Sequence, residues 1–178
     1  MDITSGDQDI ILGTRKGKAI RFNEKHVRDM GRSATGVRGI TLDPGDDAVV
    51  DMVVVKREGA TVLAVSENGY GKRSDIMDYR ITNRGGKGVI TLKTATRVGK
   101  MVALKEVVDS DDLMIITGSG LLIRQHINRI STLSRNTQGV RLINLHDGDR
   151  ISAVRYVLES EDMPDEAEAE LQDMRNDE

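Results

Sequence analysis

Arginines recur at two fixed positions along this chain, and their side chains are suited to holding phosphate. One set, separated by 52 and 51 residues, is Arg21, Arg73 and Arg124, and a second set with the same spacings is Arg32, Arg84 and Arg135. A guanidinium is always charged and binds phosphate oxygens through paired N–H donors. Two regular rows of such charge predict affinity for a polyanion backbone without reading of bases.

A basic, glycine-rich segment lies near the middle of the chain and reads Asn83-Arg84-Gly85-Gly86-Lys87-Gly88. Three glycines within four residues remove side chains, so backbone amides, Arg84 and Lys87 can approach a phosphate closely. It is not a Walker loop, because a glycine follows the lysine where that motif has Ser or Thr. The segment therefore predicts contacts with a phosphate backbone, with an exposed connection between strands as the alternative.

The residues predict no catalytic, metal or cofactor site. The chain has no cysteine, and its histidines and tyrosines fall at non-equivalent places with no close ligand spacing or activating neighbour: His26, His126, His146, Tyr70, Tyr79 and Tyr156. A glycan-cleaving propeller would need a pair of carboxylates, and none is identifiable. We therefore expect this chain not to be an enzyme by itself.

The spacing of the arginines belongs to an internal repeat of about 51 residues. Glycines keep the same offsets at Gly17, Gly69 and Gly120, and again at Gly36, Gly88 and Gly139, each of the latter followed by valine. Agreement of several positions at one offset predicts three tandem units, in residues 9–57, 58–108 and 109–158.

Each unit is predicted to form four β-strands. The expected first strands are 9–14, 61–66 and 112–117; the second are 18–22, 70–74 and 121–125; the third lie near 37–42, 88–93 and 139–145; and the fourth are 48–55, 100–107 and 150–158. The first two strands of a unit are joined at glycine, as in Asn68-Gly69, which favours a tight hairpin. A helical turn is expected around Glu24 to Met30. Four strands in about 50 residues are typical of a propeller blade, so the fold class is all-β.

Charge is distributed unevenly along the chain. Residues 1–157 carry 25 Lys and Arg against 19 Asp and Glu, whereas residues 158–178 carry one Arg against ten acids. A basic body with an acidic tail fits either a body that meets a polyanion or a mildly basic domain with a solubilising tail. Residues 159–178 break the repeat and are expected to be disordered or a short helix.

The low aromatic content favours one kind of polyanion. Binders of single strands and RNA usually offer stacking platforms, and this chain has only three Tyr and one Phe. Duplex DNA, held by its backbone and bent, is the expected partner. No apolar run reaches the ~18 residues of a membrane helix and the start lacks signal-peptide features, so we expect no membrane partner and a cytoplasmic, chromosome-associated protein.

Three stretches resemble the C-terminal domain of the bacterial DNA gyrase A subunit. They are Ser66–Arg73, Thr35–Ile40 and Ser134–Val140, and the similarity covers about residues 9–157. The resemblance implies a β-pinwheel, a propeller variant whose blades exchange strands with their neighbours and around whose basic perimeter duplex DNA wraps. Family members usually have six blades, so three blades imply the C-terminal half of the domain with its acidic tail, and residues 1–8 imply the end of a linker.

The family also has an essential box, glutamine-arginine-arginine-glycine-glycine-lysine (or arginine)-glycine, in its first blade. Arg84–Gly88 match the last five positions of this box, whereas Thr82 and Asn83 stand where glutamine and arginine would be. The segment is therefore interpreted as a box-like element in a later blade.

The function that the resemblance implies is that of a non-catalytic, DNA-wrapping domain of a type IIA topoisomerase, which lets ATP-driven strand passage by the whole enzyme introduce negative supercoils. The implied partners are duplex DNA, the rest of the gyrase A subunit and, in the holoenzyme, the B subunit. An exposed blade edge makes a second copy a further candidate. Two alternatives stay open: the C-terminal domain of the topoisomerase IV A subunit, whose blades are fewer and more degenerate, and a propeller-type protein-interaction platform.

The expected DNA-binding residues are the two arginine rows, the box-like loop and their basic neighbours. They are Arg21, Arg32, Arg38, Lys72, Arg73, Arg84, Gly85, Gly86, Lys87, Gly88, Arg124, Arg135 and Arg141. Because side chains alternate along a strand, some of these must face away from DNA, and the sequence leaves open which ones. The acids of the tail are expected to compete with DNA for the same surface.

Overall fold

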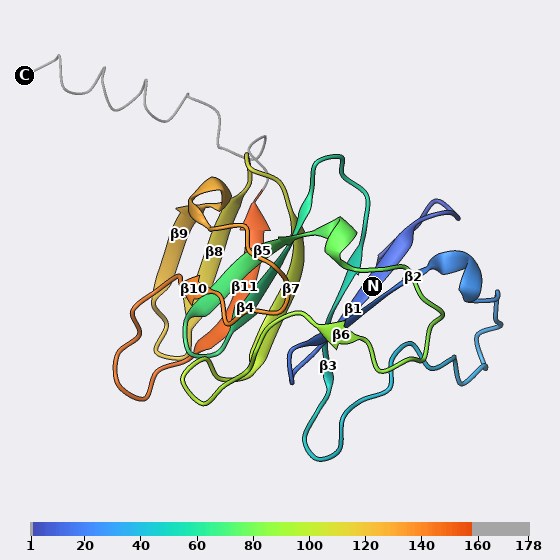
Figure 1. Cartoon of the computed structure of the whole chain (residues 1–178), viewed down its shortest axis with the longest axis horizontal. Coiled ribbons are helices and arrows are strands. Elements are labelled where there is room, and N and C mark those ends of the chain that lie inside the picture. Colours follow the sequence, from blue (N-terminus) through green and yellow to red (C-terminus); the bar gives the residue numbers. More distant parts are fainter. Residues whose placement is uncertain (1, 158–178) are drawn as a thin grey trace, which may run out of the picture.

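Three antiparallel sheets follow one another along the chain in the computed structural model, which describes residues 2–157 (Figure 1). The strands of the first repeat are β1 (Asp9–Thr14), β2 (Lys18–Asn23) and β3 (Val49–Val54); those of the second are β4 (Thr61–Ser66), β5 (Tyr70–Asp75), β6 (Val89–Ile90) and β7 (Met101–Val107); and those of the third are β8 (Asp112–Thr117), β9 (Leu122–His126), β10 (Val140–Arg141) and β11 (Ile151–Val157). The all-β fold class is confirmed.

The first, second and fourth strands of each unit are confirmed to within one or two residues at each end. The helical turn is also present, as a 3₁₀ helix shorter than expected, η1 (Glu24–His26), and it recurs as η2 (Ile76–Asp78) and η3 (Ile127–Arg129). The predicted acidic tail, residues 159–178, lies outside the described residues.

The third strands differ most from the prediction, because each one leaves its own unit. β6 pairs with β2 of the first unit, and β10 pairs with β5 of the second. The sheet orders are therefore β3-β1-β2-β6, β10-β5-β4-β7 and β11-β8-β9. The exchange of strands that the resemblance implied is present in the structure.

This exchange explains why the strand predicted at residues 37–42 is wrong. A third strand needs the second strand of a preceding unit, and no such strand precedes residues 37–42 among the described residues. The segment instead bonds the box-like loop, with Gly85 N donating to Gly39 O at 2.6 Å and Thr41 N donating to Gly86 O at 2.8 Å. Among residues 2–157 the third sheet has three strands, because no later repeat in this part of the chain supplies β9 with a crossing strand.

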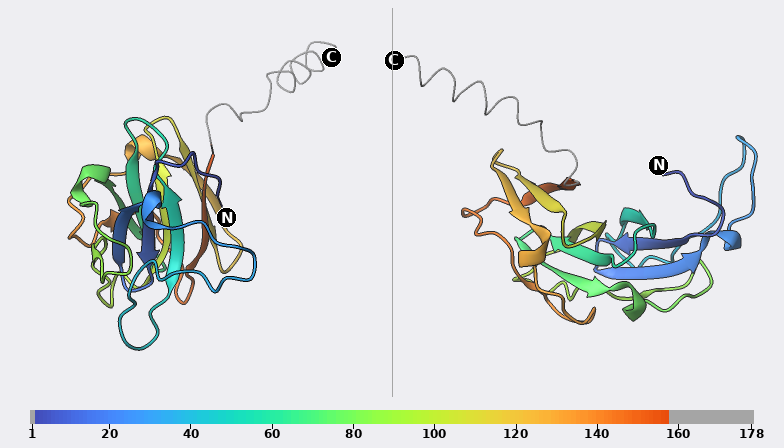
Figure 2. Two further views of the ribbon diagram at one scale, coloured as in Figure 1. Left: turned by 90° about the vertical axis from the view of Figure 1, so that its right-hand side faces the viewer. Right: turned by 90° about the horizontal axis from the view of Figure 1, so that it is seen from above.

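The core lies between neighbouring sheets. One buried cluster joins the first two blades, with Ile11 from β1 and Leu104 from β7, and a second joins the last two, with Leu63 from β4 and Ile115 from β8. The middle sheet is covered on both faces, so five of the six residues of β4 are buried, whereas β9 alternates between exposed and half-buried residues. Figure 2 shows the three sheets as a curved row. Within residues 2–157, no helix is long and apolar enough to cross a membrane.

Glycine is required where the exchanged segment crosses the neighbouring blade. Gly88 has φ +70° and packs against Ala19 of β2, where an added Cβ would lie 2.5 Å from the Ala19 carbonyl oxygen. Gly139 repeats this contact at Gly71, with a corresponding distance of 2.6 Å. The equivalent Gly36 also has a positive φ, +82°, but nothing lies within 4 Å of its Cβ position.

This contrast supplies a matched test. Gly36→Ala is expected to cost about 1 kcal/mol of unfolding free energy, which is the strain of a left-handed alanine. Gly88→Ala carries the same strain and also forces the crossing segment away from β2, so we expect a loss of about 3 kcal/mol. Urea denaturation followed by circular dichroism measures both, and equal losses would contradict the close crossing.

Candidate nucleic-acid interface

The box-like loop, Asn83–Gly88, crosses from the second blade onto the first. Arg84 anchors it there, with Nε donating to His26 O at 2.9 Å and Nη1 donating to Arg38 O at 3.2 Å. The loop is held further by Thr41, whose hydroxyl donates to Gly85 O at 2.6 Å. Arg84 and Gly85 are half-buried, whereas Gly86 and Lys87 are exposed. The loop is therefore fixed to the first blade, and it exposes the backbone of Gly86 and the ammonium of Lys87 to solvent.

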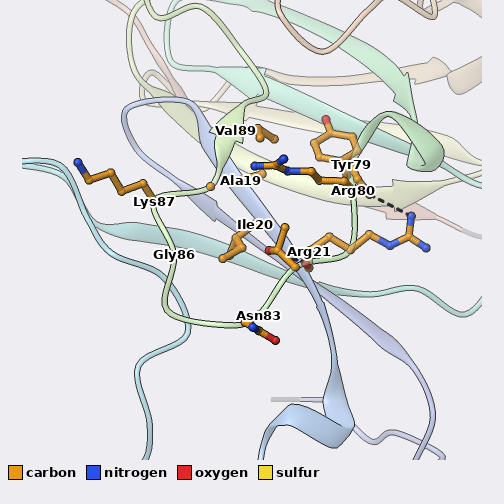
Figure 3. Close-up of a pocket in the computed structure, with 11 residues that line it drawn as sticks. Ala19, Ile20, Arg21, Tyr79, Arg80, Asn83, Gly86, Lys87 and Val89 are labelled. Carbon is orange, nitrogen blue, oxygen red and sulfur yellow. Dashed lines mark hydrogen bonds between the residues drawn. The ribbon is translucent and has the colours of Figure 1, made fainter.

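A small cavity lies beneath this loop (Figure 3). Its volume is about 260 Å³, and Ala19, Ile20, Tyr79 and Val89 contribute to its lining. Lys87 points away from this apolar floor in Figure 3. This volume is close to the lower end of the range of small-ligand pockets, ~300 Å³.

Arg21 links the first two blades. Its guanidinium pairs with Asp9 at 2.7 Å, and its Nη1 donates to the backbone oxygens of Ile76, at 2.9 Å, and Tyr79, at 3.3 Å. Its side chain is 11% exposed. Asp9 lies on β1 of the same blade, whereas Ile76 and Tyr79 belong to the second repeat. The guanidinium of Arg21 is therefore bonded within the protein, where it connects the two blades.

Arg73 makes the equivalent link between the second and third blades. It is buried, its Nε donates to Ile130 O at 2.9 Å, and its Nη1 pairs with Asp109. Arg124 is more exposed and pairs with Asp112 at 2.5 Å, as Arg21 does with Asp9. The structure thus gives Arg21 and Arg73 of this row a role in joining blades, and it does not present them for DNA.

Lys72 is also turned inward. It is fully buried, and its Nζ donates to Ser74 Oγ at 3.2 Å and to Ser134 O at 2.5 Å. Burial lowers the pKa of Lys72 from 10.5 to about 8, because an ammonium loses hydration there. Of the expected DNA-binding residues, Lys72 is therefore the least accessible.

The remaining expected residues lie at the surface. Arg32, Arg38 and Arg141 are exposed, and Arg135 is half-buried with its Nη1 donating to Ile90 O of the preceding repeat at 3.0 Å. Arg84 and Arg135 of the second row therefore stand where exchanged segments meet the neighbouring blade. Gly88 is half-buried against β2, so its main contribution is to the crossing.

Sequence reasoning missed exposed cations in the middle blade, and two of them, Lys93 and Arg97, lie in the turn before β7. They have no basic counterpart at equivalent positions, so the repeat did not reveal them. The available signal was the absence of acids from residues 93–100, since the corresponding turns of the other blades contain aspartates. Within residues 2–157, no group of three or more His, Cys, Asp or Glu side chains is placed to hold a metal ion.

Tandem blades that complete one another by strand exchange, with cations on the crossing segments, define a propeller-type domain of the pinwheel kind. The model of one family, the DNA gyrase C-terminal domain (beta-propeller), matches residues 8–56, 60–107 and 111–157. The chain belongs to this family, as the resemblance predicted.

Individual proteins agree with this assignment. The DNA gyrase A subunit of Staphylococcus aureus strain MRSA252 is 46% identical over 166 residues, which are 93% of this chain and 19% of that protein. The chain thus spans about a fifth of the length of the curated relatives it matches. A solved DNA gyrase A C-terminal domain superimposes with a TM-score of 0.79 at 29% identity, covering 85% of this chain and 51% of that one. The C-terminal domain of a DNA topoisomerase IV gives a TM-score of 0.83 at 22% identity, covering 97% and 53%, which shows a shared fold.

The link made by Arg21 predicts a large effect on stability. Arg21→Ala removes the cation that pairs with Asp9 Oδ2 and the donor to two carbonyls of the second repeat, so we expect a loss of about 3 kcal/mol of unfolding free energy. Arg38→Ala removes an exposed side chain and is expected to change stability by less than about 0.5 kcal/mol. Urea denaturation compares the two, and a similar small effect for both would remove the linking role of Arg21.

Lys72 predicts an alkaline gain in stability. Its folded pKa of about 8 lies below the value of 10.5 for free lysine, so the unfolded chain binds more protons between these pH values. The cost of burying the ammonium is therefore fully present below about pH 8 and is relieved as pH rises toward 10.5. The unfolding free energy of the native chain minus that of Lys72→Met is expected to increase over this range, and a flat difference would contradict the buried charge.

Proposed function

We propose that this chain forms part of a non-catalytic DNA-wrapping domain of a bacterial DNA gyrase A subunit. The observation that carries the proposal is the position of the exposed cations in a member of this family. Arg38 and Arg141 each lie two residues after the repeated glycine of their unit, and Lys87 directly precedes this glycine in the middle unit. Such side chains neutralise phosphates without contacting bases, which is the way a sequence-independent binder holds duplex DNA.

Wrapping follows from holding DNA at successive blades of a curved row. Smooth bending of a 20–30 bp site by 40–90° costs on the order of 1–6 kcal/mol, so several phosphate contacts must offset it. Rigid attachment of the crossing segments keeps these contacts in place, because Arg84 and Arg135 bond the backbone of the preceding repeat. The bent duplex is then presented to the rest of the enzyme for ATP-driven passage with a positive crossing, which leaves negative supercoils.

In the whole enzyme the partners would be the B subunit and the remainder of the A subunit, at the chromosome. Gyrase is preferred to topoisomerase IV because the gyrase relative is 46% identical, whereas the topoisomerase IV structure is 22% identical. The competition between the acidic residues 159–178 and DNA remains part of the proposal, and these residues lie outside the described part of the chain.

Duplex binding against salt tests the proposal. We expect the affinity of the chain for a labelled duplex of arbitrary sequence to fall steeply with salt, by a logarithmic slope of about −0.9 for each phosphate contacted. The double variant Arg38→Ala, Lys87→Ala is expected to reduce the magnitude of this slope by about 2. Lys56→Ala is the control, because its ammonium is already paired with Asp2 at 2.6 Å. Absence of binding at low salt would overturn the proposal, and binding that ignores salt would favour a protein-interaction platform.

A ligation experiment distinguishes DNA wrapping from simple DNA binding. A nicked circular DNA is sealed by ligase in the presence of the chain, and the linking number of the product is measured. A positive wrap is expected to raise the linking number of the sealed product after the protein is removed. An unchanged linking number at saturating protein would leave DNA binding in place and exclude wrapping by these three blades.

A further inference from the structure

A cationic cluster is assembled across the junction of the second and third blades. The guanidinium carbons of Arg97 and Arg141 lie 5.3 and 5.4 Å from the centre of one ring, that of Tyr70. Tyr70 begins β5, Arg97 lies in the turn before β7, and Arg141 ends the exchanged strand β10. The cluster therefore exists only because the third repeat gives a strand to the second.

Tyr70 holds the two arginines in place. It is buried at 7% exposure, and its hydroxyl accepts a hydrogen bond from Arg141 Nη2 at 2.9 Å. Stacking on an aromatic face restricts the rotamers of an arginine, which reduces the entropy lost when the side chain binds a ligand. Both arginine side chains remain exposed, so their outward N–H donors reach solvent.

The polar partners of this cluster are neutral. Arg97 Nη2 donates to Gln138 Oε1 at 3.0 Å, and Arg141 Nη1 donates to Asn144 Oδ1 at 3.0 Å. Among residues 2–157, no carboxylate lies within 4.0 Å of a nitrogen of either guanidinium. Two positive charges held near one ring raise the local electrostatic potential, which favours the binding of an anion.

The other blades carry acids at the corresponding corner. In the first blade, Lys18 occupies the position of Tyr70 and pairs with Asp43 at 2.7 Å, in a turn that also contains Asp46 and Asp47. The equivalent turn of the third blade contains Asp147 and Asp149. The middle turn, residues 93–100, has three bases and no acid of its own. The ammonium of Lys100 pairs with Asp46 of the first blade, which leaves Lys93 and Arg97 as the exposed cations of this turn.

We propose that Arg97 and Arg141 form a binding site for phosphodiesters of duplex DNA, with Tyr70 as the residue that positions them. The inference rests on the proposed function and assigns one of the places at which the domain would hold the DNA backbone. Each guanidinium donates to phosphate oxygens through N–H groups that its neutral partners leave available. The site ties two blades to the DNA at once, because its two arginines come from different repeats.

Binding of a labelled duplex as a function of salt tests this site. Arg97→Ala and Arg141→Ala are each expected to reduce affinity about tenfold and to reduce the magnitude of the salt slope by about 1. The matched control is Arg150→Ala, an exposed arginine near the turn of the third blade whose charge is already paired with Glu67 at 3.1 Å. It is expected to leave both quantities unchanged.

Tyr70→Phe separates positioning from contact. The variant keeps the ring and both arginines but removes the acceptor for Arg141, so the salt slope is expected to stay constant while the affinity falls two- to threefold, about 0.5 kcal/mol. A loss of slope in this variant would contradict the positioning role.

A measurement on the native chain guards against variants that fail to fold. Duplex DNA is expected to slow modification of Arg97 and Arg141 by phenylglyoxal, read by mass spectrometry, and to leave Arg150 unaffected. Two results would overturn this site and leave the proposed function standing. One is equal modification of all three arginines in the presence of DNA. The other is that Arg97→Ala and Arg141→Ala behave like Arg150→Ala, although the native chain binds DNA with a steep salt slope. A native chain that fails to bind at low salt would instead overturn the proposed function.

Discussion

Each blade of this domain is incomplete without the repeat that follows it, and this dependence organises the structure. The outer edge of β2 is covered by β6, and that of β5 by β10, so backbone donors and acceptors at one blade are satisfied by the next. Arg21 and Arg73 add a second link at the same junctions. Stability in such an array is set by neighbouring pairs of repeats, and damage at one junction therefore weakens two blades.

The same crossing segments also determine where charge reaches the surface. Lys87 and Arg141 lie on segments held by backbone hydrogen bonds to the preceding blade, so their positions relative to one another are fixed by packing between blades. A surface that bends DNA must resist deformation itself, since otherwise the elastic energy of the duplex would flatten the protein. Inter-blade packing and the DNA-wrapping proposal therefore depend on the same contacts.

Sequence patterns predicted the strands that form within one repeat, and they did not predict the features that depend on contacts with a neighbouring repeat. β1, β4 and β8 are runs rich in β-branched residues before a glycine turn, whereas β6 and β10 are fixed only by pairing with another repeat. Period alone did not distinguish inward from outward arginines. An aspartate twelve residues earlier marks the ion pairs of Arg21 and Arg124, but it does not mark burial, because Arg124 is half-exposed and the buried Arg73 has Thr61 there. For Lys72 the comparison between repeats did contain the signal, since the other repeats have Ile20 and Ile123 at this position. Arg97 was missed because the equivalent positions of the other two repeats, Gly45 and Gly148, carry no charge.

Within residues 2–157 no strand pairs with the outer edge of β9, and this edge is built differently from the edges that receive a strand. At the crossing point, β2 has Ala19 and β5 has Gly71, and a Cβ at Gly71 would lie 2.5 Å from Leu142 of the exchanged segment. β9 has Leu122 at this position, with 55% of the residue exposed. A strand that approached β9 as closely as β10 approaches β5 would have to displace this leucine. Self-association through this edge, which exposed strands favour in general, therefore needs a wider geometry here than the two exchanges within the chain.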